Sequence, residues 1–444
     1  MIGRKRRVLL VSPHFPPDTN AASHRIRLLA PHLAAFGWEP TVLTVAPADY
    51  EGRIDPALAA LVPDTVRVVR CRAWNHRWTR QIGLGDLGLR SFTGLYRSCL
   101  SLLEREPFDA LFITTYPLYP AALGPILKRR FAIPFVIDLQ DPWVGAWGDT
   151  VGGGTNGAPD LKSRFTRLIA ERLEKWVLPS ADAITAVSPA TYDDAIGRIG
   201  AATTSMRSAI PIGGDDNDFA AVRRSTARTT LFDPSDGNRH LCYVGTLLPL
   251  GVAPMSALLT AFARLRVSRP DLYRQTRLHF VGTSNRTIAD ERPVRQIAER
   301  VGVDDIVMEH PARIDYLDSL RVLSSATAIL LLGSTEPHYT ASKLFPALLA
   351  RRPILAAFHE RSTAVDLLRS AGRPPSIRLI AYESDFQLES LATAFHAELV
   401  ALLDSPEYNV KDTSPQRFAE FSAKALAGRL AAVFDAVHAN RCAA

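Results

Sequence analysis

The chain has 444 residues, 47% apolar and 22% charged, with a formal net charge of +7, which is typical of a globular protein and suggests about two domains. Its four cysteines form no CxxC pair and no zinc spacing, which fits a reducing cytoplasm. No stretch approaches the ~20 apolar residues of a membrane span, so we expect no membrane-spanning helix in this sequence.

The positive charge is concentrated in the first half of the chain. Residues 1–207 contain 25 Lys and Arg against 19 Asp and Glu, whereas the remainder contains 27 against 26. A basic half fits an anionic partner such as a lipid phosphate, a membrane surface or nucleic acid. Because no aromatic-basic motif of a nucleic-acid module is present, we expect no nucleic acid partner.

The basic start of the chain resembles that of a signal peptide, but the apolar run Val8–Val11 is too short for the apolar region of a signal peptide.

Residues 7–45 predict a strand, a loop, a helix and a second strand. The aliphatic run 7–12 ends at a proline-rich turn, and from Ser23 the apolar residues follow helical spacing until Gly37. Residues 41–45 form the next strand, so the two strands should be parallel neighbours in a sheet that is covered on both faces. The loop after the first strand is where such sheets bind ligands.

The strand–helix alternation then continues to the end of the chain. We expect strands at 109–114, 135–139, 183–187, 240–244, 278–281, 328–332 and 353–356, and helices at 121–130, 161–177, 257–266, 343–350 and 416–437. Residues 209–219 read as a linker. The fold class is therefore α/β with two doubly wound, Rossmann-like domains, at 1–207 and 208–405, followed by a helical segment at 406–444.

Six segments in order resemble one known family. They are SPHFPPDTNAASHRIRLLAPHLAAFGWEPTVLT, FVIDLQDPW, ADAITAVSPATYD, IPIGGDDNDF, LCYVGTLLPLGVAPMSALLTAF and YTASKLFPALLARRPILAA. Over most of its length the chain resembles the retaining glycosyltransferases of the GT-B fold, family-4 type, in the exopolysaccharide and lipopolysaccharide branch.

The resemblance implies both an architecture and a reaction. Two domains would face each other across a cleft, with the acceptor on the first domain, the nucleotide-diphosphate sugar on the second, and the last helix crossing back to the first. Transfer would proceed with retention, without metal or other cofactor, and the leaving diphosphate would help to deprotonate the acceptor. Groups aimed at the phosphate oxygens would stabilise the departing charge.

The donor site is expected at strand ends of the second domain. Backbone amides at Gly245 and Gly282 could bind phosphate, next to Thr246, and Lys343 could supply a cation beside Ser342. For Lys343 the alternative is a solvated lysine at the start of a helix.

The family's paired acidic residues are only partly present. The first corresponds to Glu336 or, by the family's spacing, to His338, either of which would be catalytic. The second falls at Pro346, which has no acceptor side chain for the ribose hydroxyls, and a usual lysine falls near Leu250.

The acceptor side is expected around the first and third strands. Asp141 follows the strand 135–139 and could orient an acceptor hydroxyl as a catalytic residue, with Asp138 beside it and Trp143 lining the cleft. Arg25 and Asn20 belong to the first loop and helix. Alternatively, Asp141 caps its loop and Arg25 is a surface arginine. We expect His14 and His24 to be structural.

Two further patterns have competing interpretations. The acidic run 215–218 could bind Mg²⁺ or Mn²⁺, but its place in the linker favours solvated turn residues, so we expect no metal site. Helix 161–177 is amphipathic and basic, a pattern of helices that lie on anionic membranes. A core-facing helix gives the same pattern, and we favour it.

The sequence thus predicts a cytoplasmic glycosyltransferase that acts on a glycan, glycolipid or lipid-linked acceptor in cell-surface polysaccharide synthesis, with peripheral contact to the inner face of the membrane as an option. A degenerate, non-catalytic homologue serving as a partner or scaffold is the first alternative, motivated by Pro346 and Leu250. A sugar-nucleotide epimerase of the same architecture is the second.

Overall fold

The structure is a computed structural model that describes residues 5–144, 161–200, 206–247, 249–284, 292–335, 343–384 and 386–443. The chain forms two compact units. The first comprises Met1–Gly213 together with Ala423–Ala444, and the second is Gly214–Ser422. The chain therefore leaves the first unit once and returns to it for its last helix.

The first unit contains a seven-stranded parallel sheet with the strand order β3-β2-β1-β4-β5-β6-β7. Its strands are β1 (Arg6–Val11), β2 (Trp38–Val45), β3 (Arg67–Cys71), β4 (Ala110–Thr114), β5 (Phe135–Leu139), β6 (Ala183–Ala186) and β7 (Met206–Ala209). Its helices are α1 (Ser23–Leu33), α2 (Pro56–Ala59), α3 (His76–Thr79), α4 (Leu87–Arg105), α5 (Leu123–Phe131), α7 (Leu161–Val177), α8 (Pro189–Ile199) and α18 (Ala423–Ala443).

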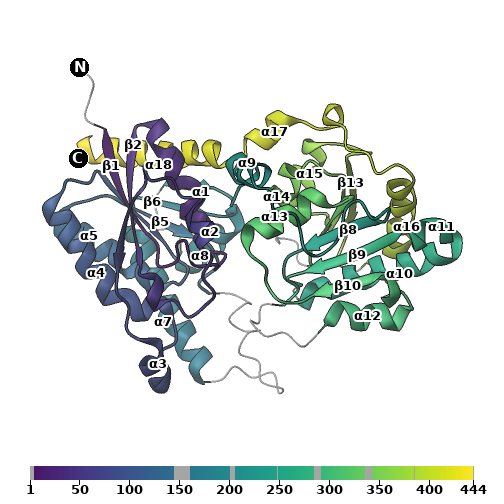
Figure 1. The fold of residues 1–444 in the computed structure, drawn as a ribbon. Coiled ribbons are helices and arrows are strands. Elements are labelled where there is room, and N and C mark those ends of the chain that lie inside the picture. Colours follow the sequence, from purple (N-terminus) through teal and green to yellow (C-terminus); the bar gives the residue numbers. More distant parts are fainter. Residues whose placement is uncertain are drawn as a thin grey trace. The chain divides into compact units, whose positions relative to one another are not determined.

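Both faces of this sheet are buried, as the apolar strand β1 requires. Val8 and Leu10 point to one face and pack in a cluster with α1 and α18, whereas Leu9 and Val11 point to the other and pack with α4 and α5. Figure 1 shows α1 and α18 beside β1 and β2, with α4 and α5 on the opposite face. The alternation follows from the two-residue period of a strand.

The last helix completes the core of the first unit. The ring of Trp38 meets Phe434 edge-on at a centroid distance of 5.2 Å, and its Nε1 donates to Asp435 Oδ1 at 2.8 Å. The single helix expected at 416–437 is two helices, α17 (Pro415–Ala419) and α18. The break has a physical reason, because Phe418 and Phe421 pack against the core of the second unit whereas Leu426 and Phe434 pack in the first.

The second unit contains a six-stranded parallel sheet with the order β10-β9-β8-β11-β12-β13. Its strands are β8 (Arg239–Val244), β9 (Thr276–Val281), β10 (Val307–His310), β11 (Ala328–Leu332), β12 (Ile354–His359) and β13 (Ile377–Tyr382). Its helices are α9 (Asp216–Arg224), α10 (Val252–Ser268), α11 (Pro270–Arg274), α12 (Pro293–Val301), α13 (Tyr316–Ser325), α14 (Leu344–Leu349), α15 (Thr363–Ala371), α16 (Leu388–Asp404) and α17.

This sheet is also covered on both faces. Leu241 and Tyr243 of β8 pack with α10 and α16, whereas Cys242 packs with α13, α14 and α15. Glycines follow three neighbouring strands at their carboxyl ends: Gly245 after β8, Gly282 after β9 and Gly333 after β11. This edge is the place where open parallel sheets bind ligands.

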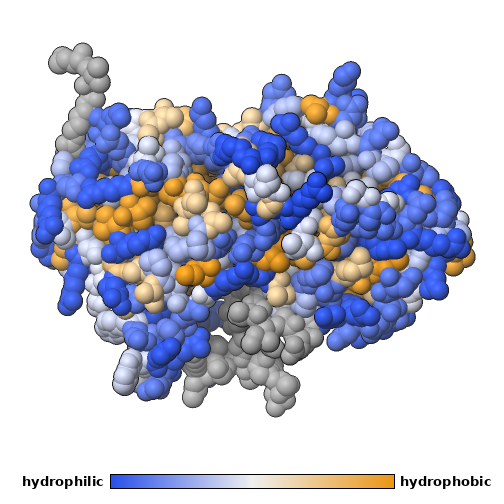
Figure 2. Space-filling model, viewed as in Figure 1, coloured by the Kyte–Doolittle hydropathy of each residue, from blue (hydrophilic) through white to orange (hydrophobic). Residues whose placement is uncertain are grey.

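Polar side chains cover most of the face drawn in Figure 2, interrupted by smaller apolar patches. Within the described residues, no helix is both long and apolar enough to cross a membrane.

Candidate functional site

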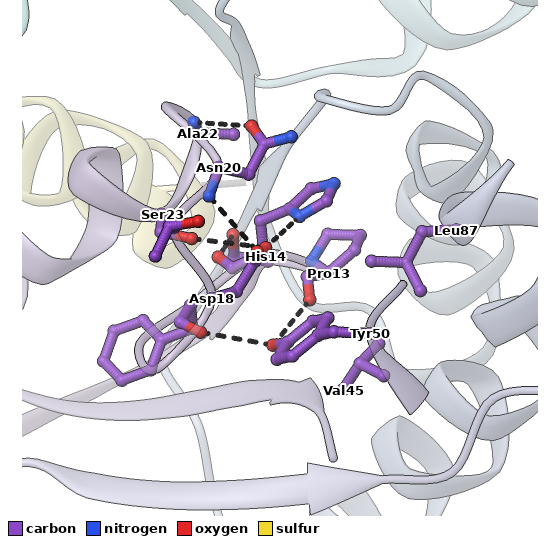
Figure 3. A network of polar contacts seen from close by, with 12 residues as sticks. Pro13, His14, Asp18, Asn20, Ala22, Ser23, Val45, Tyr50 and Leu87 are labelled. Carbon is purple, nitrogen blue, oxygen red and sulfur yellow. Dashed lines mark hydrogen bonds and ion pairs between the residues drawn. The ribbon is translucent and has the colours of Figure 1, made fainter. Parts of the chain in front are cut away.

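The loop after β1 is held by a network of side-chain contacts (Figure 3). His14 Nδ1 contacts the carboxylate of Asp18, and the Asp18 Oδ1 atom accepts from the backbone N–H of Asn20 at 3.2 Å. The Asn20 side chain in turn accepts from the N–H of Ala22 at 3.0 Å, just before α1 begins. Asn20, predicted on the acceptor side, therefore has a clear structural task as well, which is to shape the loop that leads into α1.

Arg25 and Asp138 form a buried ion pair. Arg25 Nε and Nη2 donate to the two Asp138 oxygens at 3.0 and 2.6 Å, and the two side chains are 1% and 0% exposed. Asp138 also accepts from Thr185 Oγ1 at 2.6 Å, and Arg25 donates to the carbonyls of Ile210 and Pro211. Arg25 is thus not a surface arginine, and Asp138 points into the protein instead of toward a ligand. The pair ties together α1, β5, β6 and the end of β7, which makes it a support of the predicted acceptor side.

Asp141 lies two residues beyond β5 and is exposed. Within the described residues no hydrogen bond of its carboxylate is found, so a capping role has no contact to support it there. Trp143 packs against the core of the first unit, and its Nε1 donates to Thr115 Oγ1 at 2.9 Å, which fixes the loop that carries Asp141.

In the second unit, Lys343 reaches the carboxyl end of β8. It is the N-cap residue of α14, as its sequence position suggested, and its Nζ donates to Tyr243 Oη at 2.6 Å and lies 4.1 Å from the centre of the Tyr243 ring. Tyr243 Oη donates to the carbonyl of Thr246 at 3.0 Å. Desolvation lowers the pKa of Lys343 to about 7. An anion close to a half-buried lysine stabilises the charged, protonated form of its side chain, so Lys343 in this position favours a negatively charged ligand.

Glycine is required beside this lysine. Gly245 has φ +137°, and a Cβ atom there would lie 3.3 Å from Lys343 Cδ. The missing side chain therefore leaves room for Lys343 to cross the strand end. The expected role of the amides is wrong, because the Gly245 N–H donates to Val281 O at 2.9 Å and the Gly282 N–H to His310 O at 2.8 Å. Both amides extend the sheet and are not available to phosphate.

Other predicted donor residues lie outside the described part of the chain. Glu336, His338 and Ser342 fall in residues 336–342, which the structure does not describe. Pro346 is the third residue of α14, in the first helical turn, where its missing N–H removes no intrahelical hydrogen bond. Leu250, at the position of the family's usual lysine, is exposed.

The acidic run at the start of α9 is mainly structural. Asp215 caps α9 by accepting from the N–H of Asn217 at 2.9 Å. Asp218, expected to be solvated, is buried and accepts from Tyr316 Oη at 2.8 Å. Among the described residues, no group of three or more His, Cys, Asp or Glu side chains is arranged to hold a metal ion.

Helix α7 departs from the core-facing interpretation. Phe165, Leu168 and Trp176 are exposed by 63%, 41% and 46%. Its buried side includes Glu174, which forms an ion pair with Arg198 at 2.7 Å. Ala170 and Val177 are also buried and Leu173 packs against the core of the first unit, so one side of the helix does face the core while Phe165, Leu168 and Trp176 do not.

The sequence did not predict two features of this geometry: the contact of Tyr243 with Lys343, and the contact of His14 with Asp18. The Tyr243 hydroxyl and ring that hold Lys343 carry no local signal beyond an aromatic residue in a strand. The contact between His14 and Asp18 has a signal, the spacing of four residues across a proline-rich turn, but that spacing predicts a contact only once the turn geometry is known.

Comparisons with known proteins agree with this architecture. Residues 20–207 match a sequence model of the family described as "Glycosyl transferase 4-like domain". The match begins at the end of the loop that follows β1 and covers α1 and the strands β2 to β6 of the first unit. No curated protein sequence matches the chain at a significant level.

Solved structures match over nearly the whole chain. A UDP-forming α,α-trehalose-phosphate synthase from Burkholderia vietnamiensis is 12% identical with a TM-score of 0.63, covering 98% of this chain and 100% of that one. Alr3699/HepE from Anabaena, in complex with UDP and glucose, is 16% identical with a TM-score of 0.53, covering 99% and 98%. An E. coli structure titled as trehalose-6-phosphate bound with UDP-2-fluoro glucose is 12% identical with a TM-score of 0.60, covering 98% of both chains. At these identities the likeness establishes the fold, which is that of GT-B glycosyltransferases.

Proposed function

We propose that this protein is a glycosyltransferase that moves a sugar from a nucleotide-diphosphate sugar to a hydroxyl group of a glycan, glycolipid or lipid-linked acceptor. The observation that carries the proposal is the position of Lys343, a desolvated cation against Gly245 and Tyr243 at the ligand-binding edge of the second sheet. The glycosyl transferase 4-like match of residues 20–207 supports glycosyl transfer as the reaction. A role in cell-surface polysaccharide synthesis and a cytoplasmic location complete the proposal.

The chemistry of the second unit fits a diphosphate. A departing diphosphate carries negative charge, and Lys343 can neutralise part of it as that charge develops. The Tyr243 ring and hydroxyl keep the ammonium group at the strand end, so little reorganisation is needed. No cofactor enters this scheme, and the donor sugar nucleotide is a substrate.

The test is a binding and transfer experiment on the whole chain. UDP-, GDP- and ADP-glucose are titrated by calorimetry, and transfer to glucose and octyl glucoside is followed by mass spectrometry. We expect binding of one nucleotide class and a transfer product whose anomeric configuration, measured by NMR, is retained. A folded protein that binds none of these donors would contradict the proposal, and a product of inverted configuration would contradict retention alone.

A non-catalytic scaffold remains the second candidate because Pro346 supplies no acceptor for the ribose hydroxyls. The variant Pro346→Glu separates the two candidates. If the parent binds no donor and Pro346→Glu does, the scaffold is favoured; if the parent already binds and transfers, it is excluded.

We also propose that α7 contacts an anionic membrane. Its exposed side combines Phe165, Leu168 and Trp176 with basic residues, and such helices lie in the interface of anionic bilayers. The exposed basic residues are Arg164, Arg167, Arg172 and Lys175.

Sedimentation with vesicles tests this contact. We expect binding to vesicles that contain phosphatidylglycerol, weaker binding to pure phosphatidylcholine, and loss of binding at high salt. Trp176→Ser should weaken the binding, whereas Val267→Ser, at a residue of α10 that is 83% exposed, should not. Equal binding to both lipid compositions, or equal effects of both variants, would contradict the proposal.

A further inference from the structure

Two exposed tryptophans follow the edge strand β3 of the first unit, in a stretch that we call the tryptophan segment (residues 72–80). Trp74 and Trp78 are 52% and 71% exposed, and they lie on either side of Asn75, the N-cap residue of α3. Tryptophan is highly buried on average in folded proteins. Two side chains this exposed, four residues apart, therefore suggest a surface that is covered by a partner.

The tryptophan segment is fixed to the core of the first unit. The Trp74 N–H donates to the Arg90 carbonyl at 2.9 Å, and Arg90, 1% exposed, donates from Nη1 to the Trp74 carbonyl at 2.7 Å. The Asn75 side chain accepts from the Arg77 N–H at 2.9 Å, and Thr79 is buried. The two indoles are thus held outward by an anchored backbone, so their exposure is a fixed feature of the fold.

The tryptophan segment is also basic, with three arginines and no acidic residue. Arg72 pairs with Asp49 at 2.8 Å and Arg80 pairs with Glu51 at 2.6 Å, yet the two arginine side chains are 80% and 67% exposed. Arg77 is exposed as well, and it has no ion pair within the part of the chain that the structure describes. The surface around the indoles therefore presents positive charge to an anionic partner.

An anionic bilayer would use both properties of this surface. Tryptophan is enriched at membrane interfaces because its ring is apolar and its N–H is polar. Arginine forms charge-assisted hydrogen bonds with phosphate groups, and anionic lipids attract basic residues. A neutral glycan could stack on an indole but would gain little from the positive charge.

The position of α3 within the first unit agrees with this partner. Figure 1 shows α3 and α7 at the same end of the unit. A single amphipathic helix can lie on a bilayer, but it leaves rotation of the protein about the helix axis free. A second point of contact at the same end would restrict that rotation, and two weak membrane contacts together bind far more tightly than either alone.

We propose that the tryptophan segment is a second membrane anchor, which places Trp74 and Trp78 among the headgroups of anionic phospholipids, with Arg77 against a lipid phosphate. The inference deepens the membrane contact proposed for α7, but it depends on other residues and can fail alone. Because the segment follows the carboxyl end of β3, the anchor brings the ligand-binding edge of the first sheet close to the lipid surface. This is where a lipid-linked acceptor would be presented.

Sedimentation with vesicles of phosphatidylglycerol and phosphatidylcholine tests the anchor. We expect the double variant Trp74→Ser, Trp78→Ser to bind about tenfold or more weakly than the parent. Arg77→Gln should weaken binding about fivefold, whereas Arg300→Gln, at an exposed residue of α12, should not change it. The melting temperature should stay at the parental value in all of these variants, because the side chains that they remove are exposed.

Fluorescence quenching by brominated phosphatidylcholine in the same vesicles shows whether the indoles enter the bilayer. The variant Trp176→Phe removes the indole of α7 and keeps an aromatic ring there, so the protein should still bind and its fluorescence should still be quenched. Adding Trp74→Phe and Trp78→Phe to it should leave binding nearly unchanged and remove most of that quenching. Quenching that persists in the triple variant would contradict the insertion of these two side chains.

The outcomes separate this inference from the contact of α7. If Trp176→Ser weakens vesicle binding and the Trp74→Ser, Trp78→Ser variant does not, the tryptophan segment is no anchor and the α7 contact stands. If the reverse holds, the α7 contact falls and the anchor stands. If the parent binds no vesicles, both membrane proposals fall and the glycosyltransferase is untouched. If maltoheptaose, a neutral oligosaccharide, changes the fluorescence of Trp176→Phe and vesicles do not, the segment binds glycans and the inference is overturned.

Discussion

Replacing Asp138 by Asn tests the buried ion pair that supports the first unit. The carboxylate accepts two hydrogen bonds from Arg25, at 3.0 and 2.6 Å, and one from Thr185 at 2.6 Å. The amide would keep part of the hydrogen bonding but would leave the guanidinium charge of Arg25, 1% exposed, without a counter-charge. Removing one partner of a buried pair costs about 3–5 kcal/mol, a large share of the roughly 5–15 kcal/mol that stabilise a domain.

The unfolding of this unit can be followed alone, because all six tryptophans of the chain lie before residue 213. With a urea slope of about 3 kcal/mol/M, the fluorescence midpoint of Asp138→Asn should fall by about 1–2 M. The double variant Arg25→Met, Asp138→Leu should be less destabilised than Asp138→Asn, since it leaves no unpaired charge. Arg130→Ala, which breaks a half-exposed pair with Glu104, should cost less than about 1 kcal/mol. A midpoint of Asp138→Asn within about 0.3 M of the parent would refute the reasoning.

Four other outcomes are expected. Lys343→Ala should raise the Kd for the donor about tenfold or more in calorimetry, at a cost of about 1.5–3 kcal/mol, and an unchanged Kd would remove Lys343 from the site. Because the pKa of Lys343 is lowered to about 7, its ammonium group is lost as pH rises above that value, so donor affinity should fall between about pH 6 and 9 in the parent, whereas a flat profile would contradict the assignment. Asp141→Asn should reduce transfer strongly and leave donor affinity and melting temperature nearly unchanged; transfer at the parental rate would end its catalytic role. Gly94→Ala should lower the melting temperature of the first unit, since the added Cβ would lie 2.1 Å from the Arg72 carbonyl oxygen, and parental melting would show that α4 can shift at little cost.

Much of the fold was readable from local patterns. The apolar runs of β1, β5 and β11 placed these strands within one residue of their observed bounds, and the helical spacing from Ser23 placed the start of α1 where it is observed. The edge strand β3 was missed because its sequence, RVVRC, carries two arginines, which suit a strand that is partly exposed. The long helix α4 was missed because Gly, Ser and Thr interrupt its apolar spacing.

The site was harder to predict because its contacts join distant parts of the chain. Arg25 and Asp138 are 113 residues apart, and Lys343 and Tyr243 are 100 apart. No local pattern distinguishes a surface arginine from one that will meet a buried carboxylate. The strand-end positions of Gly245 and Lys343 were predictable from the alternation of elements, but the use of the Gly245 amide within the sheet was not, since it depends on strand order.

The return of the chain to its first unit has a consequence for synthesis. The second unit begins at Gly214 and ends at Ser422, and these residues form a β-bridge to each other, so its residues are all available before α18 is made. The first unit, by contrast, lacks the helix that covers Trp38 and Phe112 until α18 has been synthesised. Domains often fold in order from the amino terminus. Here the first unit, although it is synthesised first, can complete its core only after the second unit has been synthesised.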